Sequence, residues 1–218
     1  MSKRDAIRAH YDHRFSPEKA NHEILDWASA ASQQRRFEVL VENVDLAGMK
    51  LLDVGCGLGD LLALLQRRGI EVDYTGVDIL QRMIDHCRKR FDTGRFLQAD
   101  IFSGEVFEPG QFDLVFTSGA FNLDLGNNLD FLPVAIDRLL ELSRRYVVFN
   151  LLHARWPKPE PGYFFYDPQF VLRQLARHKL AVRLIDDYLP NDFTVICRKR
   201  QKAEPGTGNQ EPGKQQAI

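Results

Sequence analysis

The 218-residue sequence lacks any long hydrophobic run, and it has no apolar segment near its N-terminus. A helix that crosses a bilayer needs about 20 mostly apolar residues, and a secretory signal needs an apolar core of roughly 7–15 residues. Because the sequence offers neither pattern, we expect a cytoplasmic protein without membrane contacts.

Cysteine is also scarce. Cys56, Cys87 and Cys197 are far apart and odd in number. Disulfide frameworks use an even number of cysteines, and zinc sites use pairs at short spacing. We therefore expect neither a disulfide framework nor a metal site.

The sequence has no excess of either charge, since 29 lysines and arginines face 30 aspartates and glutamates. Non-specific binding to nucleic acids depends on a basic field, so the composition argues against such a partner. Two short basic clusters, 88–90 and 198–200, keep that alternative open. Hydrophobic residues make up 44% of the chain, which is enough for the core of one domain with small additions.

The most informative stretch is a short apolar run followed by alternating glycines. Residues 50–54 predict a buried parallel strand that ends next to a carboxylate. Gly55, Gly57 and Gly59 let the backbone turn sharply and approach a ligand closely. A helix is expected from Asp60, which we predict to cap it. The free N–H groups at the start of this helix would then face the ligand.

The glycine spacing separates two classes of nucleotide fold. Dinucleotide enzymes use Gly-x-Gly-x-x-Gly, but Asp60 stands where the third glycine of that pattern belongs. The stretch from Asp53 to Gly59 instead resembles the first motif of class I methyltransferases that use S-adenosylmethionine (SAM). SAM carries a sulfonium cation and an ammonium group but no phosphate, so an acidic residue at the strand end suits it.

Three later strand ends agree with this resemblance. Asp78 ends a predicted strand 25 residues after Asp53, and an acid there accepts hydrogen bonds from ribose hydroxyls. Asp100 and Ile101 follow a predicted strand at 95–98, where the family places its adenine contacts. The predicted strand 112–118 is similar to the fourth motif of the family.

The C-terminal part predicts how the sheet ends. A fifth strand is expected at 145–152, followed by an antiparallel pair at 180–189 and 193–198. A dinucleotide fold usually has a sixth parallel strand instead. We therefore predict an α/β, Rossmann-like, mostly parallel seven-stranded sheet with helices on both faces and a C-terminal antiparallel strand pair.

Three regions are expected along the chain. Residues 1–45 form an N-terminal arm and helices that cover the cofactor and substrate, 46–200 form the SAM-binding methyltransferase domain, and 201–218 form a disordered tail because they contain almost nothing apolar. Within the arm, two interpretations stay open. It is a partly ordered extension, or it is a lid that contributes Tyr11 or Phe15 to the pocket.

The resemblance implies a set of cofactor-binding residues. Asp53 would orient the turn and the ammonium group, Asp78 would hold the ribose, and Asp100 with Ile101 would hold the adenine. Arg36 either lies on a solvated face or reaches the SAM carboxylate, as a preceding helix can in this superfamily. The full predicted set is Asp53, Gly55, Cys56, Gly57, Asp78, Ile79, Asp100, Ile101, Ser118 and Arg36.

No catalytic residue follows from the chemistry, because the sulfonium makes the methyl group electrophilic without help from the protein. Three residues are candidates for a role in catalysis or substrate orientation. Asn122 either orients the substrate or shapes a turn, and His153 is either a general base or a solvated loop residue. Tyr166 belongs to an aromatic segment that either forms a substrate wall or packs in the core.

The predicted function is methyl transfer from SAM to a small molecule by in-line displacement, with S-adenosylhomocysteine (SAH) as the product. Enzymes that methylate amino groups of DNA bases carry an Asn/Asp-Pro-Pro-aromatic box after the fourth strand. This sequence has Ser-Gly-Ala-Phe at 118–121 instead, which argues against that activity. The alternatives are a non-catalytic SAM-binding module and a nucleic-acid methyltransferase. An NAD-dependent oxidoreductase is disfavoured by Asp60 and by the C-terminal strand pair.

Overall fold

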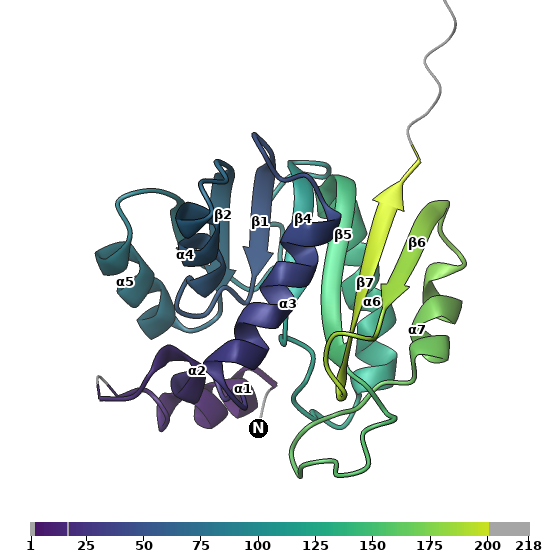
Figure 1. Ribbon diagram of the computed structural model, residues 1–218, viewed down its shortest axis with the longest axis horizontal. Coiled ribbons are helices and arrows are strands. Elements are labelled where there is room, and N and C mark those ends of the chain that lie inside the picture. Colours follow the sequence, from purple (N-terminus) through teal and green to yellow (C-terminus); the bar gives the residue numbers. More distant parts are fainter. Residues whose placement is uncertain (1–2, 17, 201–218) are drawn as a thin grey trace, which may run out of the picture.

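The computed structural model describes residues 3–16 and 18–200 of the chain. Seven strands form one sheet in the order β3-β2-β1-β4-β5-β7-β6 (Figure 1). The strands are β1 (Lys50–Val54), β2 (Asp73–Asp78), β3 (Arg95–Gln98), β4 (Phe112–Ser118), β5 (Ser143–Leu152), β6 (Leu180–Ile185) and β7 (Asp192–Lys199). The predicted tail at 201–218 lies outside the described residues.

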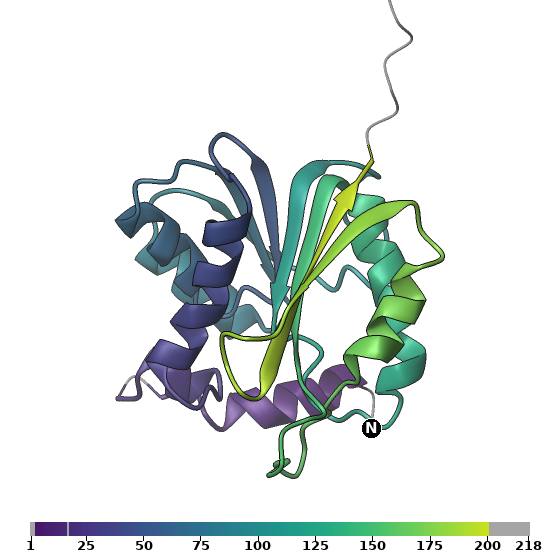
Figure 2. The ribbon, with the colours of Figure 1, turned by 45° about the vertical axis from the view of Figure 1, so that its right-hand side comes forward.

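Helices cover both faces of the sheet. The helices are α1 (Lys3–Asp12), α2 (Asn21–Ile24), α3 (Ala30–Asn43), α4 (Asp60–Arg67), α5 (Gln81–Arg90), α6 (Asn128–Leu142) and α7 (Pro168–Leu175). α3, α4 and α5 pack into the hydrophobic core on one face, whereas α6 and α7 pack into the core on the other. α1 runs across the edge of the sheet where β1 and β4 end (Figure 2).

Side-chain alternation explains how the sheet joins these two cores. Along β4, Leu114 and Phe116 enter the core under α3–α5, while Val115 between them enters the core under α6. All three are fully buried. Such a strand is apolar on both faces, as is usual for parallel sheets covered by helices on both sides.

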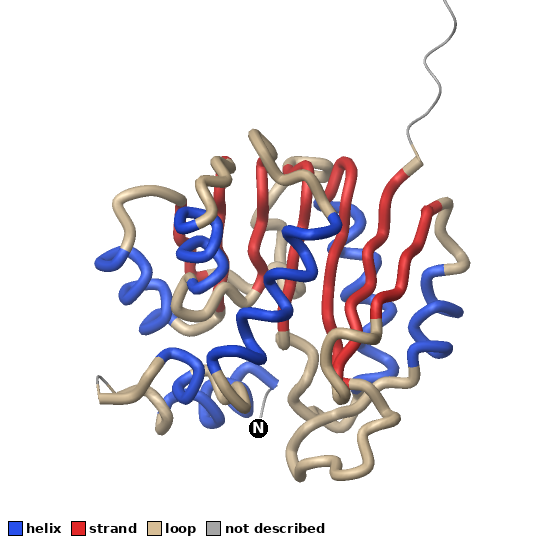
Figure 3. Tube along the Cα trace, in the orientation of Figure 1, coloured by secondary structure: helices blue, strands red, loops and turns tan. Residues whose placement is uncertain are grey.

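The order of the strands reverses between β1 and β4, which pair in parallel. Open α/β sheets bind ligands at such a switch point, in the crevice beyond the carboxyl ends of the strands. Long loops gather at this edge, including the one between β5 and α7 (Figure 3). The fold therefore directs attention to one end of β1 and β4.

The sheet predicted from the sequence is confirmed. The predicted bounds of β1, β3 and β4 match the structure residue for residue. β7 is antiparallel to both neighbours and lies between β5 and β6, as the strand-pair prediction requires. β6 is shorter than predicted, because residues 186–191 form an irregular connection.

The predicted cap of α4 is wrong. Gly59, with φ +76°, occupies the cap position, and Asp60 is the first helical residue. The Asp60 carboxylate instead accepts hydrogen bonds from Asn21, Gln33 and Arg90. It therefore ties α2, α3 and α5 to the start of α4.

None of the described helices is long and apolar enough to cross a bilayer.

A buried ion pair fastens α3 to β7. The Arg36 guanidinium donates to the Asp192 carboxylate from Nε at 2.7 Å and lies 2.6 Å away at Nη2. The two side chains are only 3% and 0% exposed. The Tyr188 hydroxyl donates to the same carboxylate. Burial raises the pKa of Asp192 to about 6, against the opposing effect of Arg36.

We expect Arg36→Met to lower the free energy of unfolding by about 3–5 kcal/mol, since it leaves the Asp192 carboxylate buried without its cation. Urea unfolding at neutral pH measures this change. Arg35→Met is the matched control, because Arg35 pairs with Glu42 on the surface and such pairs contribute about 0–1 kcal/mol. Equal losses from both variants would contradict the assignment.

Candidate functional site

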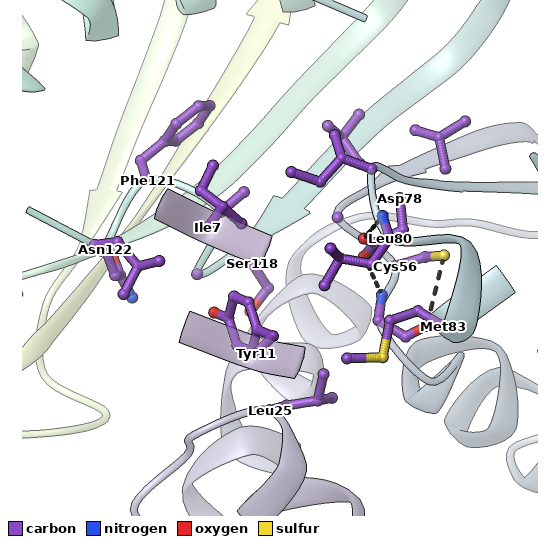
Figure 4. Close-up of a pocket in the computed structure, with 18 of the residues that line it drawn as sticks. Ile7, Tyr11, Leu25, Cys56, Asp78, Leu80, Met83, Ser118, Phe121 and Asn122 are labelled. Carbon is purple, nitrogen blue, oxygen red and sulfur yellow. Dashed lines mark hydrogen bonds between the residues drawn. The ribbon is translucent and has the colours of Figure 1, made fainter. Parts of the chain in front are cut away.

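A cavity of about 320 Å³ lies at the carboxyl edge of the sheet. It is lined by the ends of β1, β2 and β4, by the loops that follow them, and by α1. Its volume is at the lower end of the roughly 300–1,000 Å³ typical of ligand pockets. Figure 4 shows side chains from these segments turned toward one another around it.

The glycine turn forms one wall and is held against β2. Gly55 and Gly57 have φ values of +72° and +53°, which side chains rarely allow. A Cβ atom at Gly57 would lie 2.8 Å from the Leu25 side chain. The Gly57 and Leu80 N–H groups donate to the two Asp78 oxygens at 3.0 and 2.9 Å. Asp78 is thus fixed in the cavity wall, and burial raises its pKa.

Asp53 lies at the end of β1 and is almost fully buried. The Tyr74 hydroxyl donates to it at 2.6 Å. Burial raises the pKa of Asp53 to about 7, because desolvation outweighs that hydrogen bond. Neither Asp53 nor Asp78 forms an ion pair with any residue in the described ranges. Both carboxylates line the cavity, so this wall suits a cation.

The loop after β3 adds a third acid. Asp100 accepts the Phe102 N–H at 3.0 Å and forms an ion pair with Arg4 of α1 at 3.2 Å. Ile101, next to it, is buried and also lines the cavity. The ion pair joins the covering helix to the sheet edge.

The loop after β4 forms the opposite wall. Ser118 accepts a hydrogen bond from the Asn150 amide at 2.9 Å. Asn122 is buried, and its Oδ1 atom has no hydrogen-bond partner within the described part of the chain. In Figure 4, Phe121 and Asn122 lie across the cavity from Asp78 and Leu80.

Of the predicted cofactor residues, all except Arg36 line this cavity. The structure corrects the prediction for Arg36, whose guanidinium is held by Asp192 away from the cavity. It lies 4.6 Å from the centre of the Trp27 ring, and Trp27 does line the cavity. Arg36 therefore supports a wall of the site from behind.

The three catalytic candidates have different surroundings. Asn122 and Tyr166 line the cavity, but His153 does not; it lies beside Phe193 and 3.8 Å from Asp186. Burial lowers the pKa of His153. His153 lies outside the cavity, so it does not meet an acceptor bound there.

Tyr166 holds the wall in place. Its hydroxyl donates to the Phe121 carbonyl at 2.8 Å and accepts from the Asn128 amide at 3.2 Å. Burial raises the pKa of Tyr166 to about 12. Since its hydroxyl is engaged and protonated, Tyr166 shapes the loop after β4 instead of accepting a proton.

Sequence reasoning missed a cluster around Asp26. This residue has φ +59°, and its carboxylate contacts three side chains, two from the N-terminal segment and one from the loop after β5. His10 Nε2 lies 2.9 Å away, Arg14 Nη1 lies 2.7 Å away, and the Tyr163 hydroxyl donates to it. Asp26 thereby joins α1 to the loop after β5. The sequence gives no sign of this cluster. The unusual local feature is the left-handed backbone of Asp26, a non-glycine residue, and this becomes apparent only in the structure.

The covering segment uses one of its two predicted aromatic residues. Tyr11 lines the cavity together with Ile7. Phe15 instead packs against Arg82, whose guanidinium lies 4.4 Å from the ring centre. α1 therefore forms part of the site through Tyr11 and Ile7.

We expect Asp26→Asn to loosen α1, because it removes the charge that holds His10 and Arg14 while an asparagine still tolerates positive φ. Limited trypsin digestion should cut after Arg8 or Arg14 several-fold faster than in the wild type. Asp12→Asn removes a carboxylate from α1 itself and serves as the control. Unchanged digestion of Asp26→Asn would show that the cluster does not hold the helix.

The raised pKa of Asp53 predicts that the free energy of unfolding of the ligand-free protein depends on pH. Between its ordinary pKa of 3.8 and the folded value of about 7, the unfolded chain loses a proton that the folded chain keeps. The free energy of unfolding therefore falls as pH rises, by up to about 1.4 kcal/mol per pH unit. Asp53→Asn should make this fall shallower in urea unfolding between about pH 5 and 7, whereas exposed Asp73→Asn should not. Parallel curves for Asp53→Asn and wild type would refute it.

Comparison with known proteins places this site in context. Residues 51–140 match a family model described as a methyltransferase domain. A Mycobacterium tuberculosis protein named "Putative methyltransferase Rv1506c" is 31% identical over 155 residues, which cover 67% of this chain and 91% of that protein. Malonyl-acyl-carrier-protein O-methyltransferase of Acetivibrio thermocellus is 32% identical over 58% of this chain and 47% of its own length, so this chain spans less than half of that relative.

Solved structures share the fold at low sequence identity. Magnesium protoporphyrin IX methyltransferase from Synechocystis PCC 6803, crystallised with bound SAH, has a TM-score of 0.66 and 14% identity over 91% of this chain and all of that one. The cyclase SpnF has a TM-score of 0.61 and 16% identity over 79% of this chain and 83% of its own. The fold thus supports more than one reaction.

Proposed function

Because the chain belongs to the class I SAM-dependent methyltransferases, we propose that the cavity at the carboxyl edge holds SAM and that the enzyme methylates a small molecule there. The observation that carries the proposal is a pair of carboxylates, the buried Asp53 and the half-buried Asp78, which line one wall without a cationic partner among the described residues. A ligand with a sulfonium and an ammonium group supplies the missing positive charge.

Different residues of the cavity bind different parts of the cofactor. Asp78, fixed by two backbone N–H groups, presents its carboxylate to the ribose hydroxyls. Asp53, at the end of β1, faces the ammonium group. Asp100 and Ile101 hold the adenine, and the backbone of Gly55–Gly57 allows the close approach. Ser118 forms the neighbouring wall at the end of β4.

The protein promotes the reaction by aligning the acceptor with the methyl group and by excluding water from the cavity. SAM supplies an electrophilic methyl group on its sulfonium. The loop after β4 holds the acceptor opposite the cofactor wall, and α1 covers the cavity against water. Alignment of this kind can supply about 7–11 kcal/mol of the barrier. The covered, mostly apolar cavity favours a small acceptor over a base within a nucleic acid.

We expect wild-type protein to bind SAH, and Asp78→Asn to weaken this binding about tenfold or more because a charged acceptor of ribose hydrogen bonds is lost. Isothermal titration calorimetry measures the dissociation constant. Asp73→Asn, at the exposed opposite end of the same strand, is the matched control and should bind SAH like the wild type.

A methyl-transfer assay with labelled SAM and a panel of small acceptors then tests turnover. If the wild type binds no SAH, the proposed cofactor site is wrong. If it binds SAH but transfers no methyl group to any acceptor, the protein is a SAM-binding module.

A further inference from the structure

We propose that the methyl acceptor is an uncharged, mostly apolar molecule that carries a hydroxyl group, and that Asn122 recognises this hydroxyl. The inference rests on the proposed function, since it assigns the half of the cavity that faces the cofactor wall. It adds the chemical class of the substrate and a specificity-determining residue.

The charges around the cavity disfavour an anionic acceptor. The charged residues that line it are Arg4, Asp26, Asp53, Asp78 and Asp100. Arg4, the one cation in this set, is paired with Asp100. An acceptor carboxylate or phosphate would therefore enter a site that offers several carboxylates and no unpaired cation among its described lining residues. Burying a charge without a partner is costly.

The half of the cavity near the loop after β4 is mostly apolar. Its apolar side chains are those of Ile7, Trp27, Phe121, Leu123, Leu125 and Phe131. These surfaces suit an aromatic or alicyclic body. Asp26 and Tyr163 also line the cavity, but they are hydrogen-bonded to each other.

Asn122 differs from the other polar side chains of this wall. Asn127 and Asn128 line the cavity too, but the Asn128 amide already donates to the Phe121 and Leu123 carbonyls. Asn122 is 5% exposed, it lines the cavity, and its Oδ1 has no partner in the described ranges. Leaving a buried polar atom without a partner is unfavourable, and native proteins rarely do so. Figure 4 places Asn122 beside Phe121, on the acceptor side of the cavity.

A hydroxyl group is the natural complement to this amide. It can donate a hydrogen bond to Oδ1, and it can accept one from the amide N–H₂. It therefore satisfies Asn122 in either orientation of the side-chain amide. A hydroxyl also adds no charge to the apolar half.

Three probes with the same body test the inference on protein saturated with SAH: 2-naphthol, 2-methylnaphthalene and 2-naphthoate. The methyl compound has the shape of the naphthol without its hydroxyl, and the naphthoate carries a negative charge. Ligand-observed NMR titration gives the relative affinities. We expect 2-naphthol to bind about tenfold more tightly than either of the other two, the difference that one buried hydrogen bond supports.

Asn122→Leu should abolish the preference for 2-naphthol over 2-methylnaphthalene without changing SAH affinity, because the isosteric side chain removes only the amide. Asn122→Ala provides a second variant that adds no bulk. Asn43→Leu makes the same exchange at the far end of α3 and should leave the preference intact.

The outcomes separate the two proposals. Failure of the wild type to bind SAH overturns the proposed function and, with it, this inference. SAH binding with equal affinity for naphthol and either matched probe overturns the inference alone. The same holds if both Asn122 variants bind SAH normally and keep the naphthol preference.

Discussion

The two hydrogen bonds that Asp78 accepts from the Gly57 and Leu80 N–H groups organise the site. They fix the glycine turn after β1 against the end of β2, so that two segments far apart in the sequence form one wall. Parallel pairing of β1 with both β2 and β4 brings the opposite wall, from Ser118 to Asn122, to the same edge. The rest of the molecule either supports this edge or covers it.

The cover depends on charge pairs that span the chain. Arg4 meets Asp100, and Asp26 meets His10 and Arg14, so α1 is held at both ends of its path over the cavity. These contacts are only partly buried. An enzyme that must admit a cofactor and then exclude water needs a cover of this kind, held by bonds weak enough to open.

Buried and half-buried charges serve two different purposes in this fold. The Arg36–Asp192 pair is closed on itself and packs behind Trp27, so it stabilises the packing of α3 against β7. Asp53 and Asp78 have no such cation, and burial raises the pKa of both. In a structural ion pair the two charges neutralise each other. In a binding site, charges of one sign stay without a counter-charge until a ligand of the opposite sign binds.

The sequence by itself determined the sheet and the cavity wall that carries Asp53, Asp78 and Asp100. Strand alternation, the glycine turn and the acids at strand ends are local patterns, and the parallel topology brings all strand ends to one edge, so Asp53, Asp78 and Asp100 were predicted correctly as neighbours. The tertiary structure alone decided the partners of side chains. Arg36 lies 156 residues from Asp192, and Asp26 lies 137 residues from Tyr163. No local pattern encodes such pairings, because they arise only when α3 packs on β7 and the segment between α2 and α3 meets the loop after β5.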